Sequence, residues 1–136
     1  MYHLIYLSSA VNLFSDRQLE ELLEVSRQNN GSSGITGLLL YVGGNFIQLL
    51  EGEKEVVLTT HRRIANDPRH RGLITLLQGD CAKRDFNEWS MGFKKVEGPD
   101  AEKTPGYSDF LRKGTDETAQ RSVAIKLFEY FKKNNR

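Results

Sequence analysis

The alternation of residues 44–51 constrains this fold more than any other part of the sequence. An extended strand sends successive side chains to opposite faces, so Phe46, Gln48 and Leu50 share one face. That face is apolar enough to lie in a core, yet it carries a carboxamide. Because a buried amide without hydrogen-bond partners costs about 1–3 kcal/mol, Gln48 requires a partner, either a neighbouring backbone group or a bound ligand.

Composition and charge favour one soluble globular domain. The chain has 136 residues, of which 38% are apolar and 27% are charged, which is enough to build one hydrophobic core. No run approaches the ~18 apolar residues of a membrane span, and the N-terminus lacks a signal-peptide pattern, so we expect a cytoplasmic protein without a membrane segment. The single cysteine, Cys81, agrees with a reducing compartment. A net charge of +1 without charged blocks gives no support to nucleic-acid binding.

Five segments carry strand patterns. They cover residues 4–8, 35–42, 44–51, 73–77 and 90–96. The first is apolar on both faces, with Leu4, Tyr6 and Ser8 on one of them, which predicts a central place in the sheet. Glycines at the boundary of the second and third strands join them in a hairpin.

Three segments carry helix patterns. Ser15 and Gln18 form a capping box at the start of the first helix, whose apolar periodicity runs to Gln28. The second helix runs from residue 53 to residue 66, and we expect His61 to pack on its apolar face. The third covers residues 116–133 after a linker at 97–106, and its apolar face suits packing on a sheet or on a second subunit.

The order of these elements is βαββαββ, which predicts an α+β fold of the ferredoxin-like type. Such a fold has a mixed five-stranded sheet with the first two helices on one face. The third helix is then expected on the opposite face. We therefore expect one domain over residues 1–97, followed by a linker and helical segment over residues 98–136.

The predicted topology brings several polar side chains together. The first and third strands are neighbours, so Tyr6 and Gln48 can touch and form a hydrogen-bonded pair. Other polar residues fall at the ends of the two helices, namely Asn30 on the first, and Arg63, Asp67, Arg69 and His70 on the second. A flat polar ligand between the helices would meet the first three of these at its edges and the last two near any phosphate.

Five short motifs follow one another along the chain. They are Leu4-Ile5-Tyr6-Leu7-Ser8-Ser9, Asn30 before Gly34-Ile35-Thr36-Gly37, Phe46-Ile47-Gln48-Leu49-Leu50-Glu51-Gly52, Asp67-Pro68-Arg69-His70 and Trp89-Ser90-Met91. In order, spacing and residue type they resemble the motifs of the BLUF family, flavin-binding blue-light sensors, over residues 2–96. Five motifs in register are far more specific than any one, and they favour a ligand as the partner of Gln48.

The resemblance implies roles for these residues. Tyr6 matches the tyrosine that gives an electron and a proton to the photoexcited flavin, and Gln48 matches the amide between that phenol and flavin N5 and O4. The remaining matches are Asn30, Arg63 and Asp67 at the ring's pyrimidine edge, Arg69 and His70 at the ribityl or phosphate end, and Trp89 and Met91 in the fifth-strand pair whose position responds to light. Ser8, on the Tyr6 face, is expected to bond Trp89 or Gln48 in signalling, or else to fill space.

The resemblance also implies a cofactor and a class of protein. FAD is expected, although FMN and riboflavin share the ring on which the matched contacts concentrate, and no metal is expected. The chain would be a signalling protein rather than an enzyme, acting through a partner protein or a change in its own assembly, and we expect it to form a homo-oligomer. Asn29 stands where some members carry His, which would alter ring stacking without preventing binding.

A light-driven switch follows from these roles. The phenol of Tyr6 has an ordinary pKa near ~10, so it is neutral in the dark, and loss of an electron makes it a strong acid. Gln48 is the natural relay for its proton, and recombination can leave the amide rotated or tautomerised. The new hydrogen-bond pattern of Gln48 would strengthen the bond to flavin O4 and shift the absorption to the red. The structural change would then reach the fifth strand and the third helix.

Two other functions fit the same topology. An acyl-phosphate hydrolase would need a glycine-rich, anion-binding loop with Arg after the first strand, whereas this loop reads Ser9-Ala10-Val11-Asn12. A light-independent regulatory module that binds a colourless small molecule or a protein is the second alternative. The colour of the purified protein distinguishes both from a flavin sensor.

Overall fold

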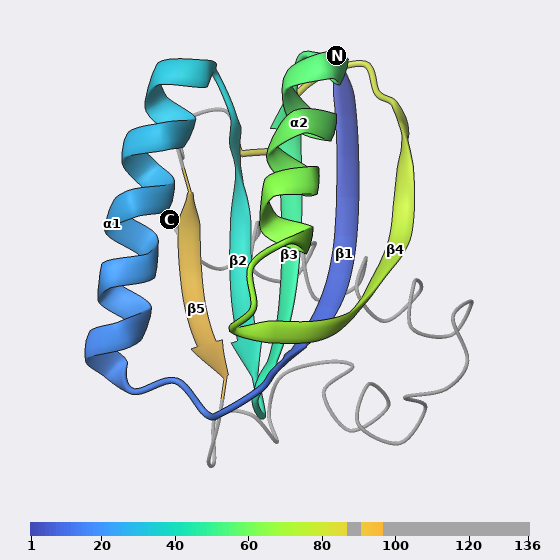
Figure 1. Cartoon of the computed structure of the whole chain (residues 1–136). Helices are drawn as coiled ribbons and strands as arrows, with labels where there is room; N and C mark the ends of the chain where they lie inside the picture. The colour runs from blue at the N-terminus through green and yellow to red at the C-terminus, as the bar shows by residue number, and fades with distance from the viewer. Residues whose placement is uncertain (87–90, 97–136) are drawn as a thin grey trace.

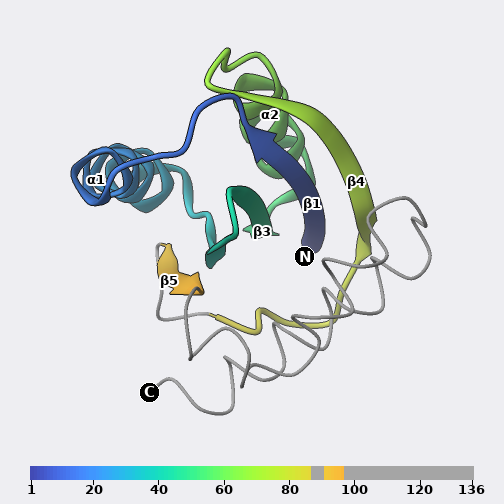
Figure 2. The ribbon, with the colours of Figure 1, turned by 90° about the horizontal axis from the view of Figure 1, so that it is seen from below.

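Five strands build one mixed sheet in the computed structural model, which describes residues 1–86 and 91–96. In chain order the elements are β1 (Tyr2–Ala10), α1 (Asp16–Ser33), β2 (Thr36–Val42), β3 (Asn45–Gly52), α2 (Lys54–Ala65), β4 (His70–Asp80) and β5 (Gly92–Val96). The strands lie in the order β4-β1-β3-β2-β5, antiparallel except for the parallel pair β2–β5. Both helices cover the same face of the sheet (Figures 1 and 2). The predicted ferredoxin-like α+β fold is confirmed, with β1 and β3 in its middle.

The start of α1 agrees with the prediction. The hydroxyl of Ser15 accepts the backbone N–H of Gln18 over 3.2 Å, and the side-chain oxygen of Gln18 accepts the N–H of Ser15 over 2.9 Å, which is a complete capping box. Just before it, the backbone N–H of Phe14 donates to the hydroxyl of Tyr41 over 3.0 Å. This bond fixes the entry to the helix against β2.

The end of α1 differs from the prediction. The helix continues past Gln28 to Ser33, so the predicted end was too early. The hydroxyl of Ser33 donates to the carbonyl of Asn29 over 2.6 Å, which keeps these polar residues in helical geometry. Gly34 then ends the helix in the left-handed conformation, with φ at 74°, which glycine adopts without steric cost.

Three strand predictions differ from the structure by two or more residues at an end. β1 was predicted over residues 4–8 but runs from Tyr2 to Ala10, because its backbone pairs with β3 and β4 beyond the apolar stretch. β4 was predicted over residues 73–77 but runs from His70 to Asp80, and it pairs with β1 along this length, from Ala10 opposite His70 to Tyr2 opposite Asp80. It lies at the edge of the sheet, where backbone pairing extends a strand beyond its apolar stretch. β5 begins at Gly92, after Met91, so its predicted start at residue 90 was too early.

The main core lies between the sheet and the two helices. It contains Leu4, Tyr6, Leu39, Phe46 and Leu50 from the strands, Leu19 and Leu23 from α1, and Val57 from α2. No helix in the described part of the chain is long and apolar enough to cross a membrane. The linker and the helix predicted at residues 116–133 lie outside the described residues.

Candidate functional site

A buried hydrogen bond joins the two middle strands. Tyr6 on β1 stands opposite Gln48 on β3 in the strand register, and both side chains are 4% exposed. The phenol donates to the Oε1 atom of Gln48 over 2.6 Å. The predicted contact between these residues is therefore confirmed.

The environment of Tyr6 keeps its proton on the phenol. Burial raises the pKa of Tyr6 well above its ordinary value, because the phenolate would lose its hydration, and the negative charge of Asp67 raises it further. The neutral phenol is consequently the stable form across the physiological range. It serves Gln48 as a hydrogen-bond donor.

Met91 completes a chain of three side chains. The Nε2 atom of Gln48 lies 3.3 Å from the thioether sulfur of Met91, which accepts its hydrogen bond. Gly37 on β2 lies beside the Met91 methyl, and a Cβ at Gly37 would lie only 1.9 Å from the carbonyl oxygen of Leu49, so the backbone of β3 requires glycine here. The sequence predicted that Met91 belongs to the switch, and the structure places it against Gln48. Trp89, its predicted companion, lies outside the described residues.

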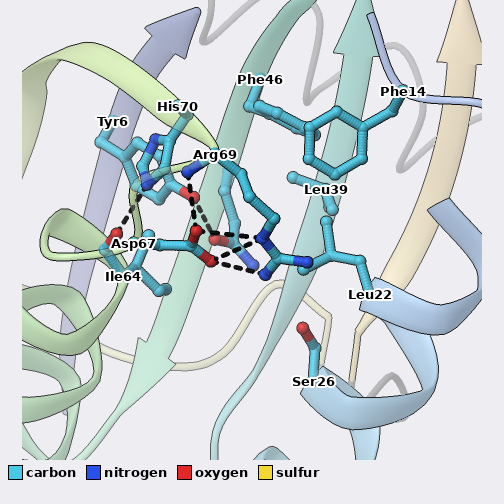
Figure 3. A pocket seen from close by; sticks show the side chains of 11 residues that line it. Tyr6, Phe14, Leu22, Ser26, Leu39, Phe46, Ile64, Asp67, Arg69 and His70 are labelled. Carbon is cyan, nitrogen blue, oxygen red and sulfur yellow. Dashed lines mark hydrogen bonds and ion pairs between the residues drawn. The ribbon is translucent and has the colours of Figure 1, made fainter. Parts of the chain in front are cut away.

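A cleft opens above this chain, between α1 and α2. It holds about 440 Å³ of space, including the part that is open to solvent. Its lining residues are Tyr6, Phe14, Leu22, Ser26, Leu39, Phe46, Gln48, Ile64, Asp67, Arg69 and His70. Figure 3 shows apolar side chains on its walls, and the Asp67 carboxylate and Arg69 guanidinium groups across its middle. Most ligand pockets combine an apolar lining with a few polar groups in this way.

An ion pair between Asp67 and Arg69 lies across the cleft. The Nε atom of Arg69 donates to both carboxylate oxygens of Asp67, over 3.0 and 3.1 Å, and the guanidinium carbon lies 5.8 Å from the centre of the Phe14 ring (Figure 3). These hydrogen bonds hold the pKa of Asp67 below its usual value. Arg69 thus extends from the start of β4 toward α1, so a ring that enters the cleft must lie beside or displace its side chain.

His70 ties α2 to β1. Its Nε2 atom lies 2.6 Å from the carbonyl oxygen of Ile64, and because a carbonyl only accepts, Nε2 carries the proton. Its Nδ1 atom lies 2.8 Å from the hydroxyl of Ser8, which in the neutral imidazole donates to it. Among the described residues, the hydrogen-bond partner of the Ser8 hydroxyl is thus His70 rather than Gln48.

Two predicted ligand contacts lie away from the cleft lining. Asn30 is only 3% exposed, in the last turn of α1, and Arg63 is exposed on α2, but neither is among the residues that line the cleft. The structure therefore brings Tyr6, Gln48, Asp67, Arg69 and His70 together without these two. Sequence reasoning did not assign the apolar lining, namely Phe14, Leu22, Leu39, Phe46 and Ile64, or Ser26. The spacing of Leu22, Ser26 and Asn30 at every fourth residue was the available signal.

His61 also lies beside Tyr6. Its ring centre is 5.7 Å from that of Tyr6, which confirms its predicted packing role. Its Nε2 atom is buried without a hydrogen-bond partner within residues 1–86 and 91–96. Burial lowers the pKa of this imidazole, so the neutral form is favoured.

The cleft suits a flat ring with polar edges. A carboxamide offers two N–H donors and an oxygen with two lone pairs. Tyr6 and Met91 engage one lone pair and one N–H of Gln48, which leaves one of each for a ligand in the cleft. The apolar walls fit the faces of an aromatic ring system, and the Asp67 and Arg69 groups match polar atoms at its rim. The residues present therefore fit a flavin.

Known proteins resemble this chain in sequence. The family model described as "BLUF: Sensors of blue-light using FAD" matches residues 1–92. The photoactivated adenylate cyclase subunit beta of Euglena gracilis is 35% identical over 89 residues, which is 65% of this chain and 10% of that protein. The blue light- and temperature-regulated antirepressor BluF of Escherichia coli (strain K12) is 37% identical over 75 residues, which is 55% of this chain and 19% of that protein. The chain thus matches only a tenth to a fifth of the length of these two relatives.

Solved structures agree with the sequence matches. The dark-state structure of BlrB, a BLUF protein, superposes with a TM-score of 0.71 and 27% identity, and the match covers 92% of this chain and 94% of that one. A bacterial light-regulated adenylyl cyclase gives a TM-score of 0.73 and 32% identity over 85% of this chain and 33% of that one. On the family match and these structures, the chain belongs to the BLUF family of blue-light sensors that use FAD.

Proposed function

We propose that this chain is a blue-light photoreceptor in which Tyr6 and Gln48 form the switch beneath a flavin bound between α1 and α2. The observation that carries the proposal is the buried 2.6 Å hydrogen bond from the phenol to the amide, at the floor of the cleft. A hydrogen-bonded pair with only a structural role would not need to face a cleft, nor would its amide need an unused N–H and an unused lone pair there. The family match supports the same site.

Gln48, Asp67, Arg69 and His70 would hold the cofactor, which in this family is FAD. When bound, a flavin absorbs blue light and supplies an excited state that accepts an electron. Asn30 and Arg63 would join the site only if their side chains turned toward the ring. FMN and riboflavin would fit the same ring-binding residues, because the three flavins share the isoalloxazine ring that Gln48 would meet.

Tyr6 supplies the electron and the proton. Its raised pKa keeps the phenol neutral in the dark, whereas the oxidised phenol is a strong acid that must release its proton. The Oε1 atom of Gln48, 2.6 Å away, is placed to accept it. When the electron returns to Tyr6, a proton returns with it, so the phenol is restored and no net oxidation remains.

The orientation of the Gln48 amide would differ before and after illumination. If the amide is left rotated, Nε2 faces the phenol and Oε1 faces the sulfur of Met91. A thioether has no hydrogen to donate, so the contact that holds Met91 in the dark is lost. The switch therefore changes the environment of Met91, directly before β5, without changing any covalent bond.

The alternative of an acyl-phosphate hydrolase finds no support in the loop after β1. The backbone N–H of Ala10 donates to the carbonyl of Gly44 and that of Val11 to the carbonyl of Arg69, each over 2.9 Å. These amides are therefore engaged and do not point to an anion. A regulatory module for a colourless ligand would lack flavin absorption, so the colour of the purified protein tests this second alternative.

The first experiment is spectroscopic. The protein should be yellow, and blue light should shift its absorption reversibly to the red. Gln48→Leu should bind flavin but lose the normal shift, and Tyr6→Phe should abolish the cycle. Tyr2→Phe is the matched control, since Tyr2 lies on the same strand and its hydroxyl bonds the amide of Gln78 over 3.3 Å. A colourless protein, or a full cycle in Tyr6→Phe, would contradict the proposal.

We also propose that the output runs through a partner protein or through self-assembly of the chain in the cytoplasm. The relatives support signalling in general, since they include a cyclase subunit and an antirepressor that respond to light. Residues 1–97 would be the sensor, and residues 98–136 would connect it to the output. Size-exclusion chromatography in darkness and in light tests this, because a change of elution volume would show light-dependent assembly.

A further inference from the structure

Met91 is held from two sides. Its thioether sulfur accepts a hydrogen bond from the Nε2 atom of Gln48 over 3.3 Å, on the sheet. Its backbone carbonyl accepts a second bond, over 2.9 Å, from the Nε atom of Arg27 on α1. Met91 itself is only 1% exposed. One residue thus connects the switch amide to a helix on the other side of the cleft.

The position of Arg27 separates it from the ligand-binding residues. It lies on α1 one residue after Ser26, which lines the cleft, but Arg27 is not itself part of the lining. α1 runs beside β5 in Figure 1 and lies on the helix side of it in Figure 2. The guanidinium reaches the carbonyl directly before β5 begins at Gly92. Its bond therefore fixes the main chain at the point where β5 enters the sheet.

We propose that Arg27 is a positioning residue that keeps the Met91 sulfur in reach of Gln48 and couples the switch to α1. The inference rests on the proposed function. In the dark arrangement, the two bonds to Met91 support each other. Once Gln48 presents its oxygen, the bond at the sulfur is lost, whereas the bond from Arg27 to the carbonyl remains. Met91 then moves relative to Gln48 while it is still attached to α1.

This coupling predicts the effect of removing the guanidinium. In Arg27→Ala, Met91 is free to move away after illumination, and its sulfur must find Gln48 again before the dark state returns. We expect dark recovery to be several-fold slower than in the unchanged protein. The dark spectrum should still show bound flavin, because Arg27 does not line the cleft.

Isotope labelling gives a readout that a purely structural role would not move. The chain has two methionines, Met1 and Met91, so a carbonyl-¹³C methionine label marks only two main-chain carbonyls. A Met91→Leu variant identifies the Met1 band. Loss of the hydrogen bond from Arg27 should raise the stretching frequency of the Met91 carbonyl in the dark and change its light-minus-dark infrared signal. Arg27→Lys, which keeps the charge and a donor, should restore part of both effects.

Arg17→Ala is the matched control. Arg17 is on the same helix, but its Nε atom pairs with Glu21 at 3.3 Å, away from Met91. If the recovery rate and the Met91 carbonyl band of Arg27→Ala match those of Arg17→Ala, the inference is wrong while the photoreceptor proposal stands. If the unchanged protein shows no light-induced spectral shift, the proposed function fails and the inference fails with it.

Discussion

Replacement of His61 should stabilise the fold, because its imidazole carries a buried nitrogen without a partner among the described residues. This nitrogen is Nε2, and the ring packs 5.7 Å from that of Tyr6. Phenylalanine keeps the packing and removes the unpaired nitrogen. Because an unsatisfied buried polar group is costly, His61→Phe should raise the free energy of unfolding by about 1 kcal/mol at pH 7.5. Urea unfolding measures this, and a destabilised variant would contradict it.

The same imidazole should make stability depend on pH. Burial lowers the pKa of His61 from its ordinary value of 6.5, so the folded protein takes up this proton less readily than the unfolded chain. His61 therefore does not lower the free energy of unfolding by taking up a proton above pH 6.5. Below pH 6.5 the free energy of unfolding falls with pH, until the pH reaches the folded-state pKa of His61. Urea unfolding between pH 8 and pH 5 should show a smaller acid-side loss in His61→Phe than in the unchanged protein. Equal losses would show that His61 is not responsible.

For single residues, the sequence was sufficient to predict a contact where the position of the side chain follows from the backbone. Two-residue alternation and strand order determine that Tyr6 faces Gln48, and the structure has them opposite each other. The sequence was not sufficient to predict the hydrogen bonds of long side chains, which can reach several different partners. The bond from Arg69 to Asp67 depends on the turn after α2, and the bond from Arg27 to Met91 joins residues 64 positions apart.

One buried carboxylate holds the chain segment that follows β4. Glu51, on β3, is 1% exposed and accepts the backbone N–H groups of Asp85 and Phe86, the latter over 2.9 Å. Its oxygen also accepts the hydroxyl of Thr36 over 3.2 Å. Since Glu51 lies on the opposite face of β3 from Gln48, the strand that carries the switch also anchors the chain segment that approaches β5.

Replacing this carboxylate should weaken that anchor. Glu51→Gln keeps the size but offers only one oxygen, so one of the two backbone N–H groups loses its acceptor. We expect a loss of about 1–3 kcal/mol in the free energy of unfolding, the usual cost of an unsatisfied buried group. Glu53→Gln, an exposed change two residues away, is the control. Equal stability of the two variants in urea unfolding would show that the carboxylate is not needed.

Elements were predictable from sequence in proportion to how local their signals are. The capping box located the start of α1, because its two hydrogen bonds join residues three positions apart. The end of α1 and the full length of β4 were missed. Polar residues at both places are held by backbone or serine hydroxyl bonds, which a hydropathy pattern does not record. The apolar lining of the cleft was missed for a similar reason, because it requires two helices to be placed at once.

The whole molecule has a sheet with two apolar faces. The helices cover one face, where Leu4, Leu39 and Leu50 lie in the main core. Strand alternation therefore assigns the apolar residues between them, Ile5, Leu38, Leu40, Ile47 and Leu49, to the other face. In an α+β protein an apolar sheet face must pack against another layer. We propose that residues 116–133 supply it, since Val123, Leu127, Tyr130 and Phe131 recur at helical spacing.

This packing predicts a difference between two faces of the proposed helix. Leu127 falls on the apolar face and Glu129 on the opposite one. If the apolar face is buried, Leu127→Ala should lower the free energy of unfolding by about 2–5 kcal/mol, the usual cost of a large-to-small change in a core. Glu129→Ala should change it by no more than about 0.5 kcal/mol, as surface changes do. Urea unfolding of the full chain in the dark compares the two variants. Equal free energies of unfolding would contradict the proposal that residues 116–133 cover the second face of the sheet.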